Sequence, residues 1–196
     1  SELTTHGNLT AAHGATGVVL GVEGKGNAMS YGEARSFLAK HTDLVELSDN
    51  AGARVAIAPA WQGRVMTSTC NGAEGLSFGF INRDFIEAGK PDAQFNNYGA
   101  EERMWLCPEG GPFSLWFKPG DEQALENWHT PPALNEGAWK VVSLQSGRQS
   151  EPRTWPGAAS VRMKTHMRFK NASGAPFGLD VTREVRLLSM SDLSGM

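Results

Sequence analysis

The sequence lacks several features that define common protein classes. Its 196 residues include two cysteines, Cys70 and Cys107, so one disulfide at most is available and a disulfide framework is excluded. No CxxC or HExxH spacing occurs, so no standard zinc site is indicated. The longest apolar run is far shorter than the roughly 20 residues that a membrane-spanning helix needs. We therefore expect no membrane span, and we expect no metal ion or organic cofactor.

The sequence also lacks an excess of positive charge. Its 18 lysines and arginines stand against 21 aspartates and glutamates, which gives a net charge of -3. A general affinity for nucleic acid needs a basic field that gathers phosphates, so nucleic acid is not an expected partner. The basic start and apolar block of an export signal are missing as well. Because the chain begins with Ser1 rather than methionine, removal of such a signal and a periplasmic location remain a hypothesis.

Turn-forming residues are abundant, with 23 glycines and ten prolines. Many turns between short apolar segments are typical of an all-β protein. Residues 1–29 show no sustained periodicity, and we interpret them as a flexible N-terminal extension. Residues 30–196 form one expected β-sandwich domain. The chain ends soon after its last strong strand pattern, so we expect this domain to be cut short at its C-terminus.

One short helix is predicted near the start of the domain, over residues 30–42. Ser30 and Glu33 have the spacing of a capping box, and Phe37, Leu38 and His41 fall roughly on one face. A second stretch, residues 76–89, reads as a strand that leads into a short helix ending at Gly89. Prolines 131 and 132 indicate a loop over residues 125–139. The remaining apolar segments are predicted strands: 44–49, 53–60, 63–69, 113–120 and 139–147.

The clearest strands are the last two. Apolar and polar residues alternate strictly over residues 161–170, which is typical of a half-buried antiparallel strand. Residues 177–189 show a second alternating pattern after the turn NASGAP, so the two segments are expected to pair as a hairpin. Their polar faces mix basic residues with Asp180 and Glu184, which predicts cross-strand charge pairs.

Five segments carry a resemblance to a known family: VAIAPAWQGRVMTST, GLSFGFIN, GAEERMWLCPEGGPFSLWF, ENWHTPP and VTREVRLLS, in this order. Together they resemble an uncharacterised bacterial family, a domain of unknown function related to the galactose mutarotase-like (aldose epimerase-like) proteins. The resemblance implies an antiparallel β-sandwich of the mutarotase-like supersandwich type, of which this chain would be an N-terminal portion. It also implies carbohydrate binding across one concave sheet.

This sequence departs from the mutarotase pattern at the catalytic residues. The Asn-His pair that supplies the general acid in aldose mutarotases is missing, and the expected place of their catalytic glutamate lies beyond Met196. Epimerase activity therefore does not transfer residue by residue. Several mutarotase-like proteins hold a structural calcium ion, but no EF-type loop occurs here.

A candidate sugar site is predicted from residues that suit sugar recognition. Aromatic faces stack on the C–H faces of a pyranose, and charged or amide side chains bind its hydroxyls. His129 and Glu109 are the candidate catalytic residues, as general acid or base. The candidate substrate-binding residues are Arg64, Asn82, Glu101, Glu102, Arg103, Trp105 and Trp128.

Structural roles compete with this interpretation. Trp116 is the tryptophan most expected in the core, because it alternates with Leu115 and Phe117. Glu101 and Glu102 are adjacent, so on an extended chain one faces a cleft at most and the other pairs with an arginine. The main hypothesis is a carbohydrate-binding or carbohydrate-processing protein whose partner is a small sugar. The alternative is a non-catalytic structural module that forms homo-oligomers through exposed strand edges.

Overall fold

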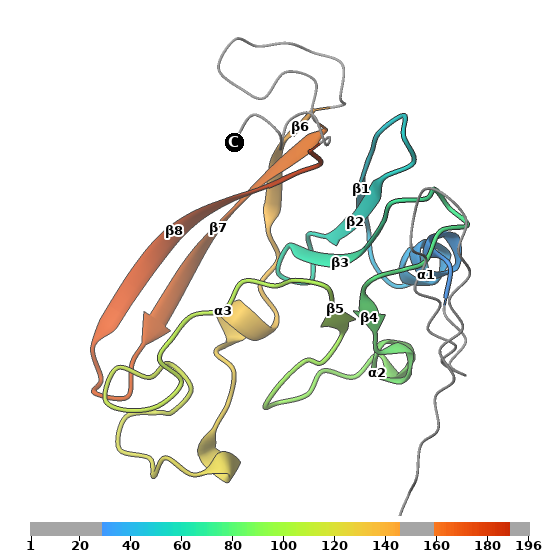
Figure 1. Ribbon diagram of the computed structural model, residues 1–196. Coiled ribbons are helices and arrows are strands. Elements are labelled where there is room, and N and C mark those ends of the chain that lie inside the picture. The colour runs from blue at the N-terminus through green and yellow to red at the C-terminus, as the bar shows by residue number, and fades with distance from the viewer. Residues whose placement is uncertain (1–28, 146–158, 189–196) are drawn as a thin grey trace, which may run out of the picture.

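The structure, a computed structural model, describes residues 29–145 and 159–188 and consists mainly of antiparallel sheets (Figure 1). The first sheet has the order β1 (Val45–Ser48), β2 (Arg54–Ala58), β3 (Arg64–Thr69). The second has the order β6 (Lys140–Gln145), β7 (Ser160–Lys170), β8 (Pro176–Arg186). A short pair joins β4 (Phe80–Ile81) to β5 (Gly99–Ala100). The helical elements are α1 (Tyr31–Leu38), α2 (Arg83–Ala88), α3 (Pro132–Asn135) and the 3-10 turn η1 (Leu125–Asn127).

The antiparallel, strand-dominated class predicted from the sequence is confirmed, and so is the short N-terminal helix, while α3 was not predicted. Residues 76–89 do contain the predicted strand and helix as β4 and α2, and Gly89 ends α2 in the left-handed conformation. The extension predicted for residues 1–29 lies outside the described residues, apart from Met29. Within the described residues, no helix is long and apolar enough to cross a membrane.

The capping box predicted at Ser30 is formed. The Ser30 backbone N–H donates to the Glu33 carboxylate at 2.8 Å, and the Glu33 N–H donates to the Ser30 hydroxyl at 3.2 Å. The helix ends at Leu38, four residues before the predicted end. Phe37 and His41 still lie on one side, with ring centroids 4.8 Å apart.

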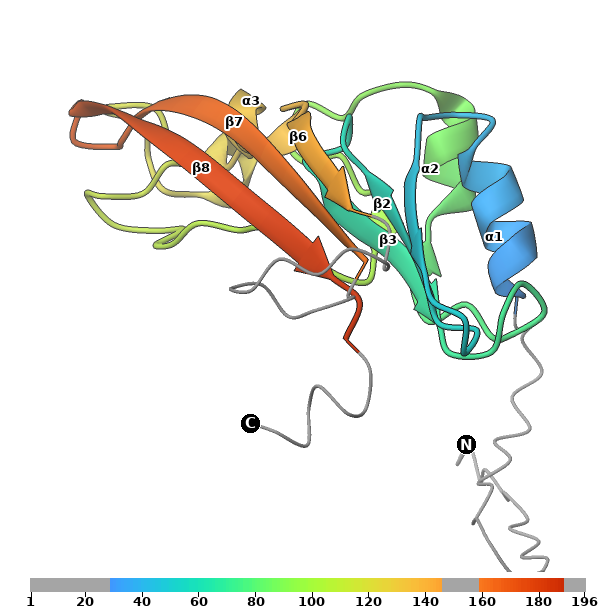
Figure 2. The ribbon, with the colours of Figure 1, turned by 90° about the horizontal axis from the view of Figure 1, so that it is seen from above.

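The first sheet is covered on both faces. Val55 and Ile57 of its central strand face the second sheet, and Ala58 and Met66 face α1. Figure 2 shows the resulting layers, in which β6, β7 and β8 lie on one side of the first sheet and α1 and α2 on the other. Both sheets therefore contribute to one hydrophobic core, while a smaller core lies beneath the helices.

The second sheet follows the alternation seen in the sequence. Along β7, Val161, Met163, Met167 and Phe169 are buried, Thr165 is half-buried, and the side chains of the alternate residues from 162 to 170 are exposed. β7 and β8 pair in continuous register from Ser160 opposite Arg186 to Lys170 opposite Pro176. The predicted cross-strand charge pairs are present: Arg162 contacts Glu184 at 2.9 Å, and His166 contacts Asp180 at 2.8 Å.

Two local predictions between residues 113 and 139 are wrong. Residues 113–120 form no strand, because side-chain and isolated backbone contacts replace a ladder: Trp116 N–H donates to the Ser114 hydroxyl at 3.1 Å, and that hydroxyl donates to the Glu109 carbonyl at 2.6 Å. The two prolines do not prevent regular structure. Pro132 begins α3, where a proline is tolerated because the first helical N–H needs no intrahelical partner.

Candidate functional site

The turn between β2 and β3, residues 58–64, carries an aromatic side chain to the edge of a cavity. Arg64 N–H donates to the Trp61 carbonyl at 3.3 Å, and Gly63 N–H donates to the Pro59 carbonyl at 3.3 Å. Gln62 and Gly63 both have positive φ angles, 65° and 60°, so the chain reverses tightly here. This turn places Trp61 in the wall of the cavity and Arg64 beneath the segment that carries Tyr98.

The cavity beside Trp61 has a volume of about 420 Å³. Ligand pockets for small molecules commonly span roughly 300–1,000 Å³, so the size suits a small ligand. Three aromatic rings, two amides and three charged or titratable side chains share its wall. Its lining comprises His41, Ala60, Trp61, Phe85, Ile86, Gly89, Lys90, Pro91, Asn96, Tyr98, Asn135 and Glu136.

The aromatic wall is preorganised by ring contacts. Trp61 and Tyr98 stack almost in parallel, with centroids 4.3 Å apart and an angle of 5° between the planes. Phe85 meets the Tyr98 ring edge-on at 5.2 Å. Trp61 and Tyr98 are half-buried, so they keep ring surface open to solvent. Burial raises the pKa of Tyr98, which remains a neutral hydroxyl donor and acceptor near neutral pH.

Arg64 fixes this wall from below. Its side chain is 1% exposed and donates to the Gln62 amide oxygen at 2.8 and 3.1 Å. It also donates to the carbonyls of Asn96 at 3.1 Å and Gly99 at 3.0 Å. Burial, and secondarily the charge of Arg103, lowers the pKa of the Arg64 guanidinium. Arg64 therefore acts as a buried clamp on the segment that carries Tyr98, and its donors are used within the protein.

Two buried asparagines form the floor of the cavity. Asn96 N–H donates to the Asn135 amide oxygen at 2.7 Å, and the Asn96 amide nitrogen donates to the Asn135 carbonyl at 3.1 Å. The Asn135 amide nitrogen donates to the Asp92 carbonyl at 3.1 Å. Asn96 and Asn135 are 0% and 3% exposed, so these amides serve to hold the segments that line the cavity together.

The rim of the cavity is charged and exposed. Lys90 and Glu136 contribute one full charge of each sign, and His41 adds an imidazole. A lysine donates hydrogen bonds and a carboxylate accepts them. The rim can therefore both donate hydrogen bonds to ligand hydroxyl groups and accept hydrogen bonds from them, while the aromatic rings cover an apolar face of the ligand.

The tryptophans predicted as site residues do come together, but around a buried ring. Trp105 and Trp128 both pack on Trp116, at centroid distances of 5.1 and 6.3 Å. Trp116 is 1% exposed, as expected for a core member. Trp105 and Trp128 are half-buried and pack against the main core. Among the residues that the structure describes, the lining of the 420 Å³ cavity includes none of the nine predicted site residues.

The predicted catalytic pair lies at this tryptophan cluster. Glu109 accepts a hydrogen bond from the Trp105 indole N–H at 2.6 Å. His129 is exposed; its backbone N–H donates to the Trp116 carbonyl at 2.9 Å, and its Nδ1 lies 3.1 Å from the Asn127 carbonyl. Both contacts fix the local chain, and no direct contact links the two side chains among the described hydrogen bonds.

Arg103 is the charged member of the tryptophan cluster. Its guanidinium lies 4.3 Å from the Trp105 ring centroid and 5.0 Å from that of Phe95. It donates to the Leu134 carbonyl at 3.0 Å. Its Nε and Nη1 are buried and lack a hydrogen-bond partner within the described residues. Burial lowers the pKa of Arg103, and the aromatic rings provide much of its surroundings.

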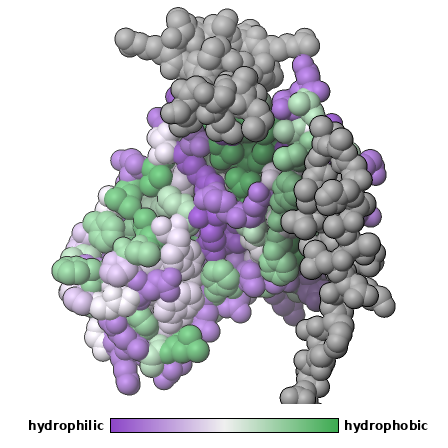
Figure 3. All heavy atoms as spheres, in the orientation of Figure 1, coloured by the Kyte–Doolittle hydropathy of each residue, from purple (hydrophilic) through white to green (hydrophobic). Residues whose placement is uncertain are grey.

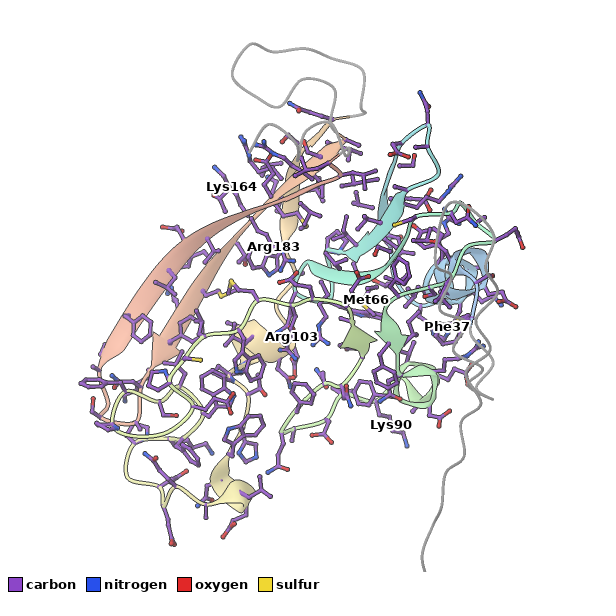
Figure 4. All side chains as sticks on the ribbon, in the orientation of Figure 1. Phe37, Met66, Lys90, Arg103, Lys164 and Arg183 are labelled. Carbon is purple, nitrogen blue, oxygen red and sulfur yellow. The ribbon has the colours of Figure 1, made fainter. Side chains whose placement is uncertain are left out.

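The other three predicted residues lie elsewhere. Asn82 caps α2 by accepting from the Phe85 N–H at 3.3 Å. Glu101 accepts from the Ser68 hydroxyl at 2.8 Å. Glu102 forms an ion pair with Arg183 of β8, in a shallow groove of about 540 Å³ between β8 and residues 102–104. Figure 4 shows Arg183 between the two sheets, and Figure 3 shows hydrophilic surface in this middle region.

Sequence reasoning missed Trp61, Tyr98, Lys90 and Glu136. A signal existed for Trp61, because an aromatic residue in the hairpin turn PAWQGR stands out where loops concentrate function. No three His, Cys, Asp or Glu residues in the described part of the chain are grouped so that they could hold a metal ion. Cys70 and Cys107 are both exposed and unbonded.

Comparison with known proteins gives one similarity. Residues 29–196 match the model of a family of unknown function, DUF6786. None of the curated proteins and none of the solved structures compared with the chain matches it.

Proposed function

Because the chain belongs to the DUF6786 family of unknown function, we propose from its own geometry that it binds a small carbohydrate in the cavity beside Trp61 and Tyr98. The observation that carries the proposal is the composition of that cavity. Stacked aromatic rings, buried amides and charges of both signs line one space of about 420 Å³.

This combination matches the two demands of a sugar. The C–H face of a pyranose is apolar and lies well against an indole or phenol ring, while its hydroxyls need both donors and acceptors. Trp61 supplies the ring, and Lys90 supplies donors at the rim. Glu136 accepts from hydroxyls, which is a stronger interaction when the acceptor is charged. A purely hydrophobic metabolite would make no use of this charged rim.

The proposal includes a mutarotase-like architecture. Two antiparallel sheets that share one core are consistent with it. The geometry favours binding over epimerisation, because Glu109 and His129 belong to the tryptophan cluster and line no wall of the cavity. We accordingly assign no catalytic step to this chain.

The test is a titration with mono- and oligosaccharides, followed by calorimetry and tryptophan fluorescence. We expect at least one sugar to bind, and we expect Trp61→Ala to weaken its binding at least tenfold. A nucleic-acid base stacked on an aromatic side chain contributes about 1–3 kcal/mol, and a sugar face stacked on Trp61 should lose a comparable amount. Trp128→Phe is the matched control and should leave affinity within twofold. A panel in which no sugar binds, or a Trp61→Ala protein with unchanged affinity, would refute the proposal.

A second candidate, assembly with another copy, draws on β6. All six of its residues are exposed, including Val142 and Leu144, and within the described residues it pairs on one side only, with β7. An exposed strand edge is a template for pairing with another chain. Measurement of the mass in solution separates the two proposals, since a monomer that binds sugar supports the first alone.

A further inference from the structure

The outer face of β7 carries a continuous row of basic side chains. Every outward position from 162 to 170 is basic, and all five side chains are exposed: Arg162, Lys164, His166, Arg168 and Lys170. Figure 4 shows Lys164 projecting away from the body of the protein. The chain as a whole is acidic, with a net charge of -3, so this face differs in sign from the average surface.

Carboxylates balance part of this row. Arg162 contacts Glu184 at 2.9 Å, and His166 contacts Asp180 at 2.8 Å. Lys164 instead faces Thr182 on β8, and Arg168 and Lys170 face residues without a charge, Gly178 and Pro176. Three of the five basic side chains therefore have no carboxylate in cross-strand register within the described residues.

The other neighbour of Lys164 adds a further positive charge. Lys140 of β6 lies directly opposite Lys164 in the register of the sheet. Like charges in directly opposed positions destabilise a sheet. An anion bound between the two ammonium groups would remove this repulsion. The Lys140–Lys164 pair therefore favours anion binding and does not stabilise the sheet by itself.

The geometry of a strand spaces these charges regularly. Alternate residues are roughly 6.6 Å apart, so the row from residue 162 to 170 is about 27 Å long. We propose that this row binds a linear acidic polysaccharide, a chain of sugars with carboxylates at intervals. The choice of a glycan rests on the proposed function, but the row shares no residue with the sugar cavity.

Other polyanions fit this face less well. Asp180 is exposed beside the row, with a side chain 91% accessible, and Glu184 is adjacent. A carboxylate is able to accept hydrogen bonds from sugar hydroxyls, and it repels widely spaced sugar carboxylates less than the closely spaced phosphates of a nucleic acid. The outward side of β7 also carries no aromatic side chain for base stacking beyond His166 and no apolar one for insertion into a bilayer.

The test uses polygalacturonate and its methyl-esterified form, which keeps the sugar chain and blocks the carboxylates. We expect the full chain to bind the acid polymer by calorimetry at about 50 mM salt, with affinity that falls as salt rises. The double variant Lys164→Ser/Lys170→Ser should bind at least tenfold more weakly. The control Lys40→Ser/Arg83→Ser removes the same charge from exposed positions at α1 and α2, on the other side of the first sheet, and should stay within twofold.

The proposal would be overturned if the acid polymer did not bind, or if the esterified polymer bound equally well. It would also be overturned if both double variants weakened binding equally, or if single-stranded DNA bound equally tightly through Lys164 and Lys170. Trp61→Ala separates this site from the sugar cavity. This variant should leave the affinity for the acid polymer unchanged. A lower affinity would indicate that the polymer binds in the cavity and would refute the β7 site. Absence of polymer binding with intact binding of small sugars refutes this inference while the proposed function stands.

Discussion

Replacing Arg64 with methionine tests whether a buried cation holds the aromatic wall in place. The substitution keeps most of the side-chain volume and removes the guanidinium. The Gln62 amide oxygen and the Gly99 carbonyl lose the donors of Arg64, whereas the Asn96 carbonyl keeps its hydrogen bond from the Tyr98 N–H. A buried acceptor left without a partner costs about 1–3 kcal/mol.

The opposing effect is the removal of a buried charge. Arg64 has no carboxylate partner within the described residues, and burial lowers its pKa, so the folded state holds this cation at a cost. Removing that cost offsets part of the penalty for leaving the Gln62 and Gly99 acceptors without the donors of Arg64. We expect Arg64→Met to lower the free energy of unfolding by about 3 kcal/mol. Arg64→Lys should recover only part of it, because one ammonium cannot reproduce the planar fork.

Urea denaturation at neutral pH measures this change. Arg83→Met is the control, since Arg83 is exposed and its contact with Glu87, at 3.8 Å, should contribute about 0.3–0.5 kcal/mol. In protein that remains folded, loss of the clamp should also weaken sugar binding. An Arg64→Met protein as stable as the wild type would refute the view that the donors of Arg64 hold residues 96–99.

Two further predictions concern single contacts. Ser30→Ala removes the N-cap of α1 and should lower the free energy of unfolding by about 1 kcal/mol in thermal denaturation, whereas Ser36→Ala, on the exposed side of the same helix, should not. Hydrogen bonds from Arg186 and then Arg162 lower the pKa of Glu184, so its stabilisation is complete above the ordinary glutamate pKa of 4.5 and is lost as pH falls through the lower folded value. Glu184→Gln should therefore reduce the stability difference between pH 7 and pH 3 by about 0.5 kcal/mol, and an unchanged difference in urea unfolding would contradict the assignment.

The sequence predicted correctly those elements that depend only on residues close together in the chain. The alternation in β7 and the Ser30–Glu33 spacing each depend on neighbours within a few residues, and both were correct. The segment 113–120 failed because its alternation is indistinguishable from that of a strand. Only the Ser114 hydroxyl, which occupies local backbone groups, shows why a ladder does not form there.

The candidate site was less predictable, because five separate segments build the cavity. Trp61, Phe85, Tyr98 and Glu136 are far apart in the sequence and meet only in the folded protein. The sequence places Trp105 and Trp128 in a predicted sugar site and Trp116 in the core, and it gives no sign that the three rings pack on one another. In the structure they surround Trp116, and so a cluster rich in indole rings became part of the core.

The turn of residues 58–64 joins the two layers as well as presenting Trp61. Gln62 N–H donates to the Gly137 carbonyl at 3.1 Å and Trp139 N–H donates to the Pro59 carbonyl at 2.9 Å, just before β6 begins. A ligand that immobilises Trp61 should consequently slow amide hydrogen exchange in β6 and β7, far from its own contacts. Ligand binding in the cavity beside Trp61 would then be detectable as slower amide hydrogen exchange across the interface between the two sheets.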